Sequence, residues 1–336
     1  MMGQRLLFSA GPRVEMESFA VPIPQAGQIL VRVSRSQVSA GSEMNFVRHG
    51  AAAYGLKPDG RESFPIGYMA VGCVDALGAD VTDFAIGDRV LTGGNHGSHW
   101  LVDPAQASGH IAKLPDNVSD EAAGFAILGD VALHGVRRAQ LQIDESVAVF
   151  GMGMVGQLTL QLARLSGAYP LIAVDLFDSR LEGAKQSGAT HVINAVRDDV
   201  VQAIRAITDG AGADTIFHCT QAAHIMQNLL EAAADRGTII LTGSAPGVAQ
   251  IRLQEELLRR ELTIIGNYEA RMNDAHPYWQ WTRERNRRAC LRLMKEGQLK
   301  VDHLITHVVP YTEAQAVFEM MARGGDDWLG VVLKWD

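Results

Sequence analysis

The chain has few cysteines, and their positions argue against a fold built on disulfides. Cys73, Cys219 and Cys290 are the three cysteines among 336 residues, and none belongs to a Cys-x-x-Cys pair. A disulfide framework needs a larger set of cysteines at short spacings. Hydrophobic residues make up 47% of the chain, so a large buried core can stabilise the fold instead.

Long uncharged apolar spans and basic runs are also absent. The first eleven residues contain too short an apolar segment for a signal peptide, and no later span is long enough for a transmembrane helix. The formal net charge is -8, and no run of Lys and Arg offers a surface for nucleic acid or an anionic membrane. We therefore expect a cytoplasmic protein that binds a small molecule, with no nucleic-acid or membrane partner.

The length and the changing pattern of the sequence predict two domains. Up to about residue 125, short strands are broken by Gly, Pro and Asp, which predicts a mostly β, barrel-like domain. Between residues 126 and 267, six apolar runs alternate with helical periods, which predicts a six-stranded parallel sheet in a doubly wound α/β domain. The remainder, with an amphipathic helix over about 282–296 and two strand-like runs, is expected to return to the first domain.

Residues 147–175 have the pattern of a strand, a tight turn, a helix and a second strand. Gly151 permits a sharp turn out of the strand, Gly153 allows backbone to approach a pyrophosphate, and Gly156 allows the helix to pack closely on the strand. The pyrophosphate is expected at the helix N-terminus, at Met154 and Val155, where free N–H groups and the helix dipole favour an anion. The stretch predicts a dinucleotide-binding unit.

Asp175 ends the second strand of this unit, 19 residues after Gly156. A carboxylate there accepts hydrogen bonds from the ribose hydroxyls and repels a 2′-phosphate, which predicts NAD rather than NADP. Asn267 either faces the nicotinamide or forms the domain boundary. The other residues expected to contact the cofactor are Arg180, Cys219, Thr220, Thr242 and Gly243.

Taken together, the β-rich N-terminal part, the Gly87-Asp88-Arg89-Val90 turn, the motif at Gly151 and the C-terminal return resemble the medium-chain dehydrogenase/reductase superfamily. The resemblance covers essentially the whole chain. It implies a GroES-like catalytic domain of residues 1–125 and 268–336, a Rossmann NAD-binding domain of residues 126–267, and hydride transfer between the domains. It also implies a homodimer or homotetramer, for which residues 262–266 would supply a sheet edge.

Many members of this superfamily hold a catalytic zinc, and this sequence differs at each ligand position. Residues 40–43 (Ala-Gly-Ser-Glu), 67–69 (Gly-Tyr-Met) and 126–129 (Ala-Ile-Leu-Gly) stand where those relatives have Cys-Gly-x-Asp, Gly-His-Glu and a further Cys or Glu. Zinc needs thiolate, imidazole or carboxylate ligands, so we expect no metal. Residues 38–43 and 65–72 most resemble the zinc-lacking branch that includes bacteriochlorophyllide a dehydrogenase.

Four residues are candidates for catalysis without a metal. The resemblance places Ser42 at the proton relay, Tyr68 at a zinc-ligand histidine, and Glu43 at the acid that orients that histidine, while His96 is expected at the pocket mouth. A phenol, with an unperturbed pKa of about 10, is a proton donor at neutral pH. Three alternatives stay open: Ser42 caps a turn, Tyr68 fills the zinc space and bonds Glu43, or Glu43 lies on the surface.

We predict a zinc-independent oxidoreductase that transfers a hydride between NAD(H) and a polar secondary alcohol or ketone of the sugar or cyclitol type. The alternatives are an alkene or quinone reductase of the same superfamily and a non-catalytic NAD-binding regulatory protein. Asp175 disfavours the first, because those reductases resemble NADPH users.

Other patterns of histidine and cysteine predict neither a metal site nor a nucleophile. His96 and His99 lack flanking ligands for a metal. His134 is expected to be a structural histidine between the domains, and Cys219 lacks the histidine base that a nucleophilic cysteine needs.

Overall fold

The computed structural model describes residues 1–9, 13–50, 63–104, 111–268 and 279–336. It divides into two compact units: Met1–Ile127 with Asn273–Glu296 and Leu304–Asp336, and Leu128–Met272 with Gly297–His303. The sequence-based division placed residues 297–303 with the first unit. In the structure they join the second unit, where the Gln161 amide bonds both the N–H and the carbonyl of Lys300, each at 2.8 Å.

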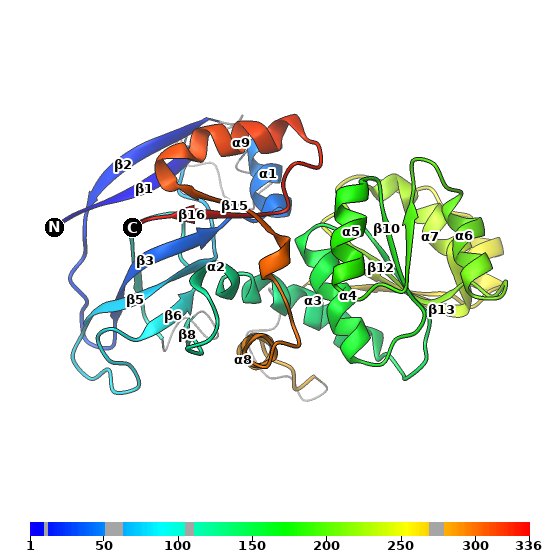
Figure 1. Cartoon of the computed structure of the whole chain (residues 1–336), viewed down its shortest axis with the longest axis horizontal. Coiled ribbons are helices and arrows are strands. Elements are labelled where there is room, and N and C mark those ends of the chain that lie inside the picture. Colours follow the sequence, from blue (N-terminus) through cyan, green and yellow to red (C-terminus); the bar gives the residue numbers. More distant parts are fainter. Residues whose placement is uncertain (10–12, 51–62, 105–110, 269–278) are drawn as a thin grey trace. The chain divides into compact units, whose positions relative to one another are not determined.

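The first unit contains two sheets (Figure 1), and most of its strand pairs are antiparallel. The larger sheet has the order β15 (Ile305–Pro310), β16 (Gly330–Lys334), β3 (Ile29–Gln37), β5 (Ala70–Leu77), β6 (Arg89–Thr92) and β8 (Ile111–Lys113), and β7 (His99–Val102) also pairs with β3. The pair β15–β16 is parallel. The smaller sheet has the order β2 (Val14–Ala20), β1 (Met2–Ser9) and β4 (Ser63–Phe64).

Two helices of the first unit, α1 (Ala40–His49) and α9 (Ala314–Arg323), contribute to its main hydrophobic core. Phe8 of β1, Phe46 of α1 and Phe318 of α9 are almost completely buried in this core. Each large aromatic side chain removes much apolar surface from water, so these three residues stabilise the packing of α1. This packing anchors α1 to the core of the first unit.

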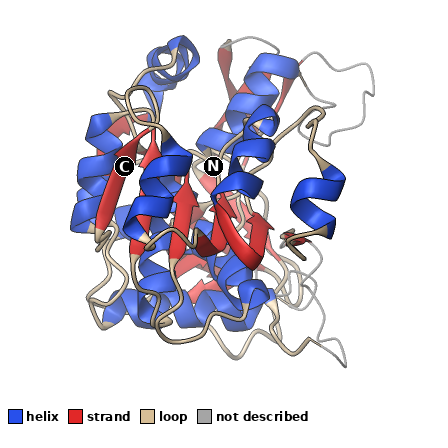
Figure 2. Ribbon diagram, turned by 90° about the vertical axis from the view of Figure 1, so that its right-hand side faces the viewer, coloured by secondary structure: helices blue, strands red, loops and turns tan. Residues whose placement is uncertain are grey.

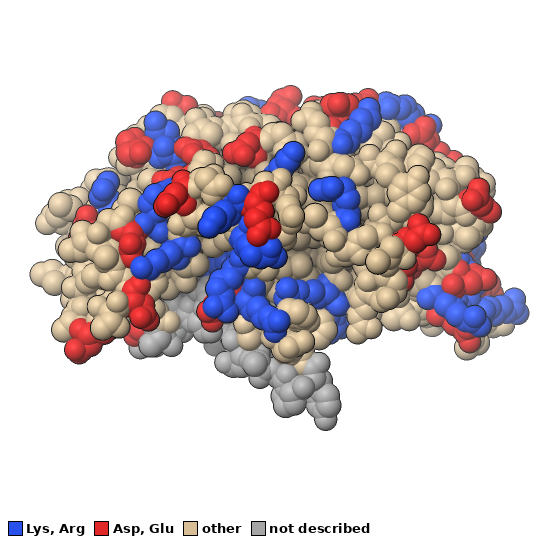
Figure 3. Space-filling model, turned by 60° about the horizontal axis from the view of Figure 1, so that its bottom comes forward, with Lys and Arg blue, Asp and Glu red and all other residues tan. Residues whose placement is uncertain are grey.

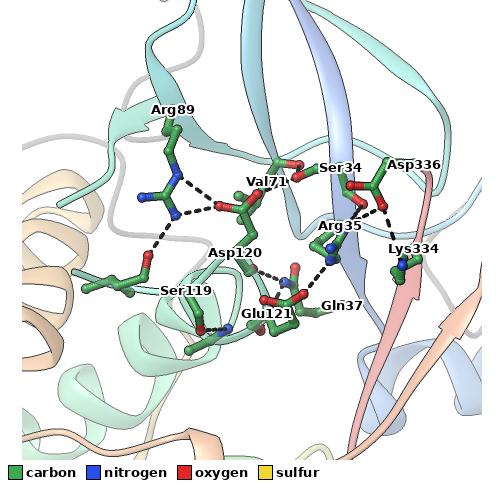
Figure 4. A network of polar contacts seen from close by, with 12 residues as sticks. Ser34, Arg35, Gln37, Val71, Arg89, Ser119, Asp120, Glu121, Lys334 and Asp336 are labelled. Atoms are coloured by element: carbon green, nitrogen blue, oxygen red, sulfur yellow. Dashed lines mark hydrogen bonds and ion pairs between the residues drawn. The ribbon is translucent and has the colours of Figure 1, made fainter. Parts of the chain in front are cut away.

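A polar network joins β3 and β6 to the short helix α2 (Asp120–Ala123), as Figure 4 shows. The Asp120 carboxylate accepts hydrogen bonds from Ser34 at 2.6 Å and Arg89 at 3.1 Å. Arg35 donates to Glu121 at 2.6 Å and to the side chain of the C-terminal residue at 2.7 Å. These bonds tie segments far apart in the sequence into one unit.

The second unit is a parallel sheet covered by helices on both faces. Its strand order is β11 (His191–Asn194), β10 (Leu171–Asp175), β9 (Val147–Phe150), β12 (Ala213–His218), β13 (Ala233–Leu241) and β14 (Thr263–Gly266). Figure 1 shows α4 (Met154–Leu165) and α5 (Asp178–Gln186) on one face and α6 (Val200–Ile207) and α7 (Met226–Ala232) on the other, and Figure 2 shows helices flanking the strands. The predicted fold class, an antiparallel β domain plus a six-stranded doubly wound domain, is confirmed.

Two further helices are α3 (Ala126–Ala139), which begins at the boundary of the units, and α8 (Arg283–Lys295) in the first unit. Within the described ranges, no helix combines the length and the apolar character needed to cross a membrane. Basic and acidic side chains are interspersed over much of the face drawn in Figure 3.

Candidate active site

The loop between β9 and α4 has the geometry that its three glycines predict. Gly151 adopts a φ of +92°, a left-handed conformation that favours glycine. A Cβ added at Gly156 would lie 1.8 Å from the carbonyl oxygen of Gly151, so only glycine fits there. A Cβ at Gly153 would meet no atom within 4 Å, which leaves open space in front of this backbone for a ligand.

The same loop leads into the N-terminus of α4, which begins at Met154 with Gly153 as its N-cap residue. The first N–H groups of a helix, here those of Met154 and Val155, have no partner inside the helix. Together with the helix dipole they favour a bound anion such as a pyrophosphate. The loop and the helix therefore fit a dinucleotide in both shape and charge.

Asp175 lies beside this loop, as predicted, and it also organises the loop's backbone. One carboxylate oxygen accepts a hydrogen bond from the Met152 N–H at 2.6 Å, and the other accepts from Leu176 at 2.8 Å and Phe177 at 3.0 Å. A carboxylate offers about four acceptor positions, so the buried group retains acceptor capacity for a ribose hydroxyl. The structure thus brings Asp175 and the glycine loop together.

The sequence analysis missed a charged pair close to Asp175. Asn194 pairs with Asp175 across the sheet, and its side chain donates to Asp178 at 2.9 Å. Arg197 binds the same Asp178 carboxylate through two bonds of 2.7 Å, and these bonds lower the pKa of Asp178 to about 2. A cation therefore lies near the predicted ribose position, neutralised by Asp178.

The remaining predicted cofactor residues lie at the carboxyl ends of neighbouring strands, except Arg180, which is on α5 with its guanidinium 4.9 Å from the ring of Phe177. A Cβ at Gly243 would lie 2.3 Å from the Thr220 carbonyl oxygen, so these two strand ends touch. Asn267 donates to the Val131 carbonyl at 3.0 Å and to Thr242 at 3.4 Å.

Cys219 directly follows β12, at one of these strand ends, and its thiol is unreactive. Burial raises the pKa of the Cys219 thiol to about 12, although the residue as a whole is partly exposed. Because the thiolate is the reactive form of cysteine, Cys219 is not suited to act as a nucleophile at neutral pH. This agrees with the sequence interpretation of Cys219.

In the first unit, three hydroxyl groups meet at the start of α1. The Tyr68 phenol is hydrogen-bonded to the Ser39 hydroxyl and lies 3.4 Å from the Ser42 hydroxyl. Tyr68 and Ser42 are partly exposed, whereas Ser39 is buried. The structure therefore brings together the two predicted hydroxyl donors, and it adds Ser39, which the sequence analysis did not single out.

Glu43 and His96 form a fully buried pair behind these hydroxyls. The Nε2 atom of His96 is 2.9 Å from one Glu43 oxygen, and the other oxygen accepts from the Ser39 N–H at 3.0 Å. The His96 Nδ1 is 2.8 Å from the Ser36 hydroxyl, which accepts from the Trp335 indole N–H at 2.9 Å. With Ser36 donating to Nδ1, the Nε2–H donates to the Glu43 carboxylate.

Two alternatives that the sequence left open for Glu43 do not match the structure. Glu43 is not a surface carboxylate, because its exposed fraction is 0%, and its partners are His96 and Ser39 rather than Tyr68 or Ser42. The His96 ring is also completely buried, although the residue contributes to the wall of a pocket of about 360 Å³. No local sequence pattern indicates a bond between residues 53 positions apart.

Comparison with known proteins identifies the family. A family model described as zinc-binding dehydrogenase matches residues 154–284. D-guloside 3-dehydrogenase of Escherichia coli is 31% identical over 253 residues, which cover 75% of this chain and 71% of that protein. The chain belongs to the medium-chain dehydrogenase/reductase superfamily. The predicted oxidoreductase class is confirmed at the level of an NAD(P)-dependent dehydrogenase.

Solved structures of this superfamily share the fold over almost the whole chain. An Escherichia coli oxidoreductase/dehydrogenase of unknown specificity superposes with a TM-score of 0.88 at 21% identity, covering 99% of both chains. The 2R,3R-butanediol dehydrogenase of Bacillus subtilis gives a TM-score of 0.82 at 20% identity, also covering 99% of both. At this identity the likeness concerns the fold alone.

Among the described residues, the side chains at the superfamily's zinc-ligand positions differ from those that zinc prefers. In the ranges that the structure describes, no group of three or more His, Cys, Asp or Glu side chains could hold a metal ion. Ala40 and Met69 offer no ligand of the kind zinc prefers. Glu43 and His96 are bonded to each other, and the Nδ1 of His99 is 3.0 Å from the hydroxyl of Ser98.

Proposed function

We propose that this protein is a zinc-independent dehydrogenase that uses NAD and acts on a polar secondary alcohol, or on the corresponding ketone, of the sugar or cyclitol type. The observation that carries the proposal is the meeting of Tyr68, Ser42 and Ser39 at the start of α1. The superfamily resemblance puts zinc at this position in other members. The relative named for a guloside supports an alcohol substrate of this class.

In place of zinc, these hydroxyl groups would stabilise the negative charge that develops on the substrate oxygen. Bound NAD supplies or accepts the hydride. In the reducing direction, Tyr68 donates its phenolic proton to the carbonyl oxygen, and Ser42 donates a hydrogen bond to the negative charge that develops there. Donors aimed at such a charge lower the transition-state energy more than the ground-state energy. In the oxidising direction the O–H bond of the alcohol breaks, and its proton passes to the Tyr68 phenolate oxygen.

The preference for NAD rests on the charges at the end of β10. The Asp175 carboxylate is adjacent to the glycine loop, where it would repel a 2′-phosphate. Arg197, a cation able to attract that phosphate, is bound by Asp178. The same preference disfavours the alkene or quinone reductase alternative, and it is compatible with the finer resemblance to the zinc-lacking bacteriochlorophyllide a dehydrogenase branch.

The test is a panel of polyols, sugars and cyclitols with NAD, followed by the absorbance of NADH. We expect turnover with at least one member, unchanged activity in a chelator, and no stoichiometric zinc in elemental analysis of the purified protein. About one zinc per chain with activity lost in chelator would contradict zinc independence. Tight NAD binding without turnover on any substrate would favour the non-catalytic alternative.

A further inference from the structure

Ser39 occupies the N-cap position of α1 but does not cap the helix. Its backbone is extended, as at other N-caps, yet its side chain makes no capping hydrogen bond. At three other helices the N-cap side chain accepts from the N–H three residues later: Ser119 for α2, Asp199 for α6 and Thr282 for α8. This is the usual role of Ser, Thr and Asp at that position.

A different residue satisfies the start of α1. Glu43, one turn into the helix, reaches back with one carboxylate oxygen to the Ser39 N–H at 3.0 Å. Its other oxygen is held by His96 at 2.9 Å, and both side chains are completely buried. The ring of His96 is held in turn by the Ser36 hydroxyl at 2.8 Å. The backbone of Ser39 is thus fixed while its hydroxyl is directed to Tyr68.

We propose that Ser39 is a positioning residue for Tyr68, and that the buried Glu43–His96 pair holds Ser39 for this task. The proposal rests on the proposed function, in which Tyr68 carries the proton. It assigns a role to a buried serine that neither its helix position nor the superfamily's metal-ligand pattern suggests.

The chemistry gives Ser39 a reason to bond the phenol. When Tyr68 passes its proton to the carbonyl oxygen, its O–H bond breaks, an O–H bond forms on the substrate, and a phenolate remains until a solvent proton replaces the lost one. The Ser39 O–H can donate to this phenolate, and a hydrogen bond to an ionised oxygen is stronger than one to a neutral oxygen. Ser39 therefore stabilises the phenolate, which is the form of Tyr68 that remains after proton transfer to the carbonyl oxygen.

The experiment measures the Tyr68 titration directly, without a substrate. The full chain is produced with 3-fluorotyrosine at its six tyrosines, and the ¹⁹F resonance of Tyr68 is assigned by its loss in Tyr68→Phe. We expect Ser39→Ala to move the titration midpoint of this resonance to higher pH by about one unit. It should also lower kcat about 10- to 100-fold with little change in the KM for NAD.

Ser119→Ala is the matched control, because it removes a serine that does cap a helix. It should lower the Tm and leave both the Tyr68 titration and kcat unchanged. Ser39→Ala should instead change the Tyr68 titration and kcat and leave the Tm nearly unchanged. Ser39→Thr should restore kcat. Glu43→Gln, which keeps the side-chain shape, should lower kcat as well and should shift the same resonance.

An unchanged Tyr68 titration in Ser39→Ala would overturn the proposal, and so would a result in which Ser39→Ala only lowers the Tm. The proposed function fails separately: if Tyr68→Phe keeps normal kcat while Ser39→Ala still shifts the resonance, the contact is real but the phenol is not the proton carrier. In that case the role of Ser39 in positioning a catalytic group is overturned with it.

Discussion

At the scale of single residues, the proposed preference for NAD over NADP rests on three charges near the end of β10. Asp175 is buried and bonded to the glycine loop, so its charge is fixed in place. Arg197 and Asp178 are mostly exposed partners, and their bidentate geometry neutralises the cation. Breaking this pair removes the carboxylate that neutralises Arg197.

Asp178→Asn is therefore expected to raise the affinity for NADP about tenfold, or ~1.4 kcal/mol, with little change for NAD. Equilibrium titrations with both cofactors measure the ratio. Glu261→Gln is a suitable control, because it breaks a comparably exposed ion pair with Arg236 in the same unit. An unchanged ratio in Asp178→Asn would show that Arg197 cannot reach the cofactor.

His134 on α3 gives a pH dependence of stability. Burial, with Arg138 and Arg137 nearby, lowers the pKa of His134 from 6.5 to about 4. Because its pKa is lower in the folded protein, His134 binds a proton more readily in the unfolded chain. The contribution of His134 to the free energy of unfolding is therefore fully present above pH 6.5 and is lost as the pH decreases toward 4. The loss amounts to about 3 kcal/mol for this residue.

His134→Gln removes the titrating group. Between pH 7 and pH 4, the free energy of unfolding of this variant should therefore decrease less than that of the wild type. Denaturant unfolding at several pH values provides the comparison. Parallel pH curves for the two proteins would mean that His134 is protonated equally in the folded and unfolded states.

At the scale of elements, two glycines of the β9–α4 turn have different roles. Gly156 is required for close packing, whereas Gly153 is expected to make room for the cofactor. A methyl group at Gly156 would overlap the Gly151 carbonyl, whereas one at Gly153 would enter open space. Gly156→Ala should therefore destabilise the protein by about 1–3 kcal/mol and weaken NAD binding. Gly153→Ala should leave the Tm nearly unchanged and still weaken NAD binding, measured by titration of each variant. Normal NAD affinity in Gly153→Ala would place the pyrophosphate elsewhere.

The strands and the glycine loop could be predicted because their signals are local. Six apolar runs predicted the six parallel strands of the second unit, and the glycine spacing predicted the loop that Gly151 and Gly156 form. The structure starts β13 at Ala233, although Asp235 and Arg236 interrupt the apolar pattern of that strand. The fold class followed from such patterns alone.

At the scale of the whole molecule, the proposed site depends on residues that the chain brings together from distant positions. The Trp335 indole reaches Ser36 across 299 positions, and His96 reaches Glu43 across 53. No periodicity or spacing encodes such contacts, which is why the sequence placed Glu43 with Tyr68 and left Ser39 unnoticed. Positions in the superfamily pattern indicated Ser42 and Tyr68, whereas only the fold revealed the buried groups that support them.

The central claim is that the Tyr68 phenol donates and accepts the substrate proton at the position where other members of the superfamily hold zinc. The kcat of Tyr68→Phe tests this claim most directly. The matched control is Tyr169→Phe, an exposed tyrosine of the second unit. Tyr311 is unsuitable, because it stacks on Trp335 and so contacts the buried chain. On the substrate found by the panel, we expect Tyr68→Phe to lose about 10²–10³ in kcat with NAD affinity unchanged and Tyr169→Phe to match the wild type. A Tyr68→Phe variant with wild-type kcat would contradict the claim.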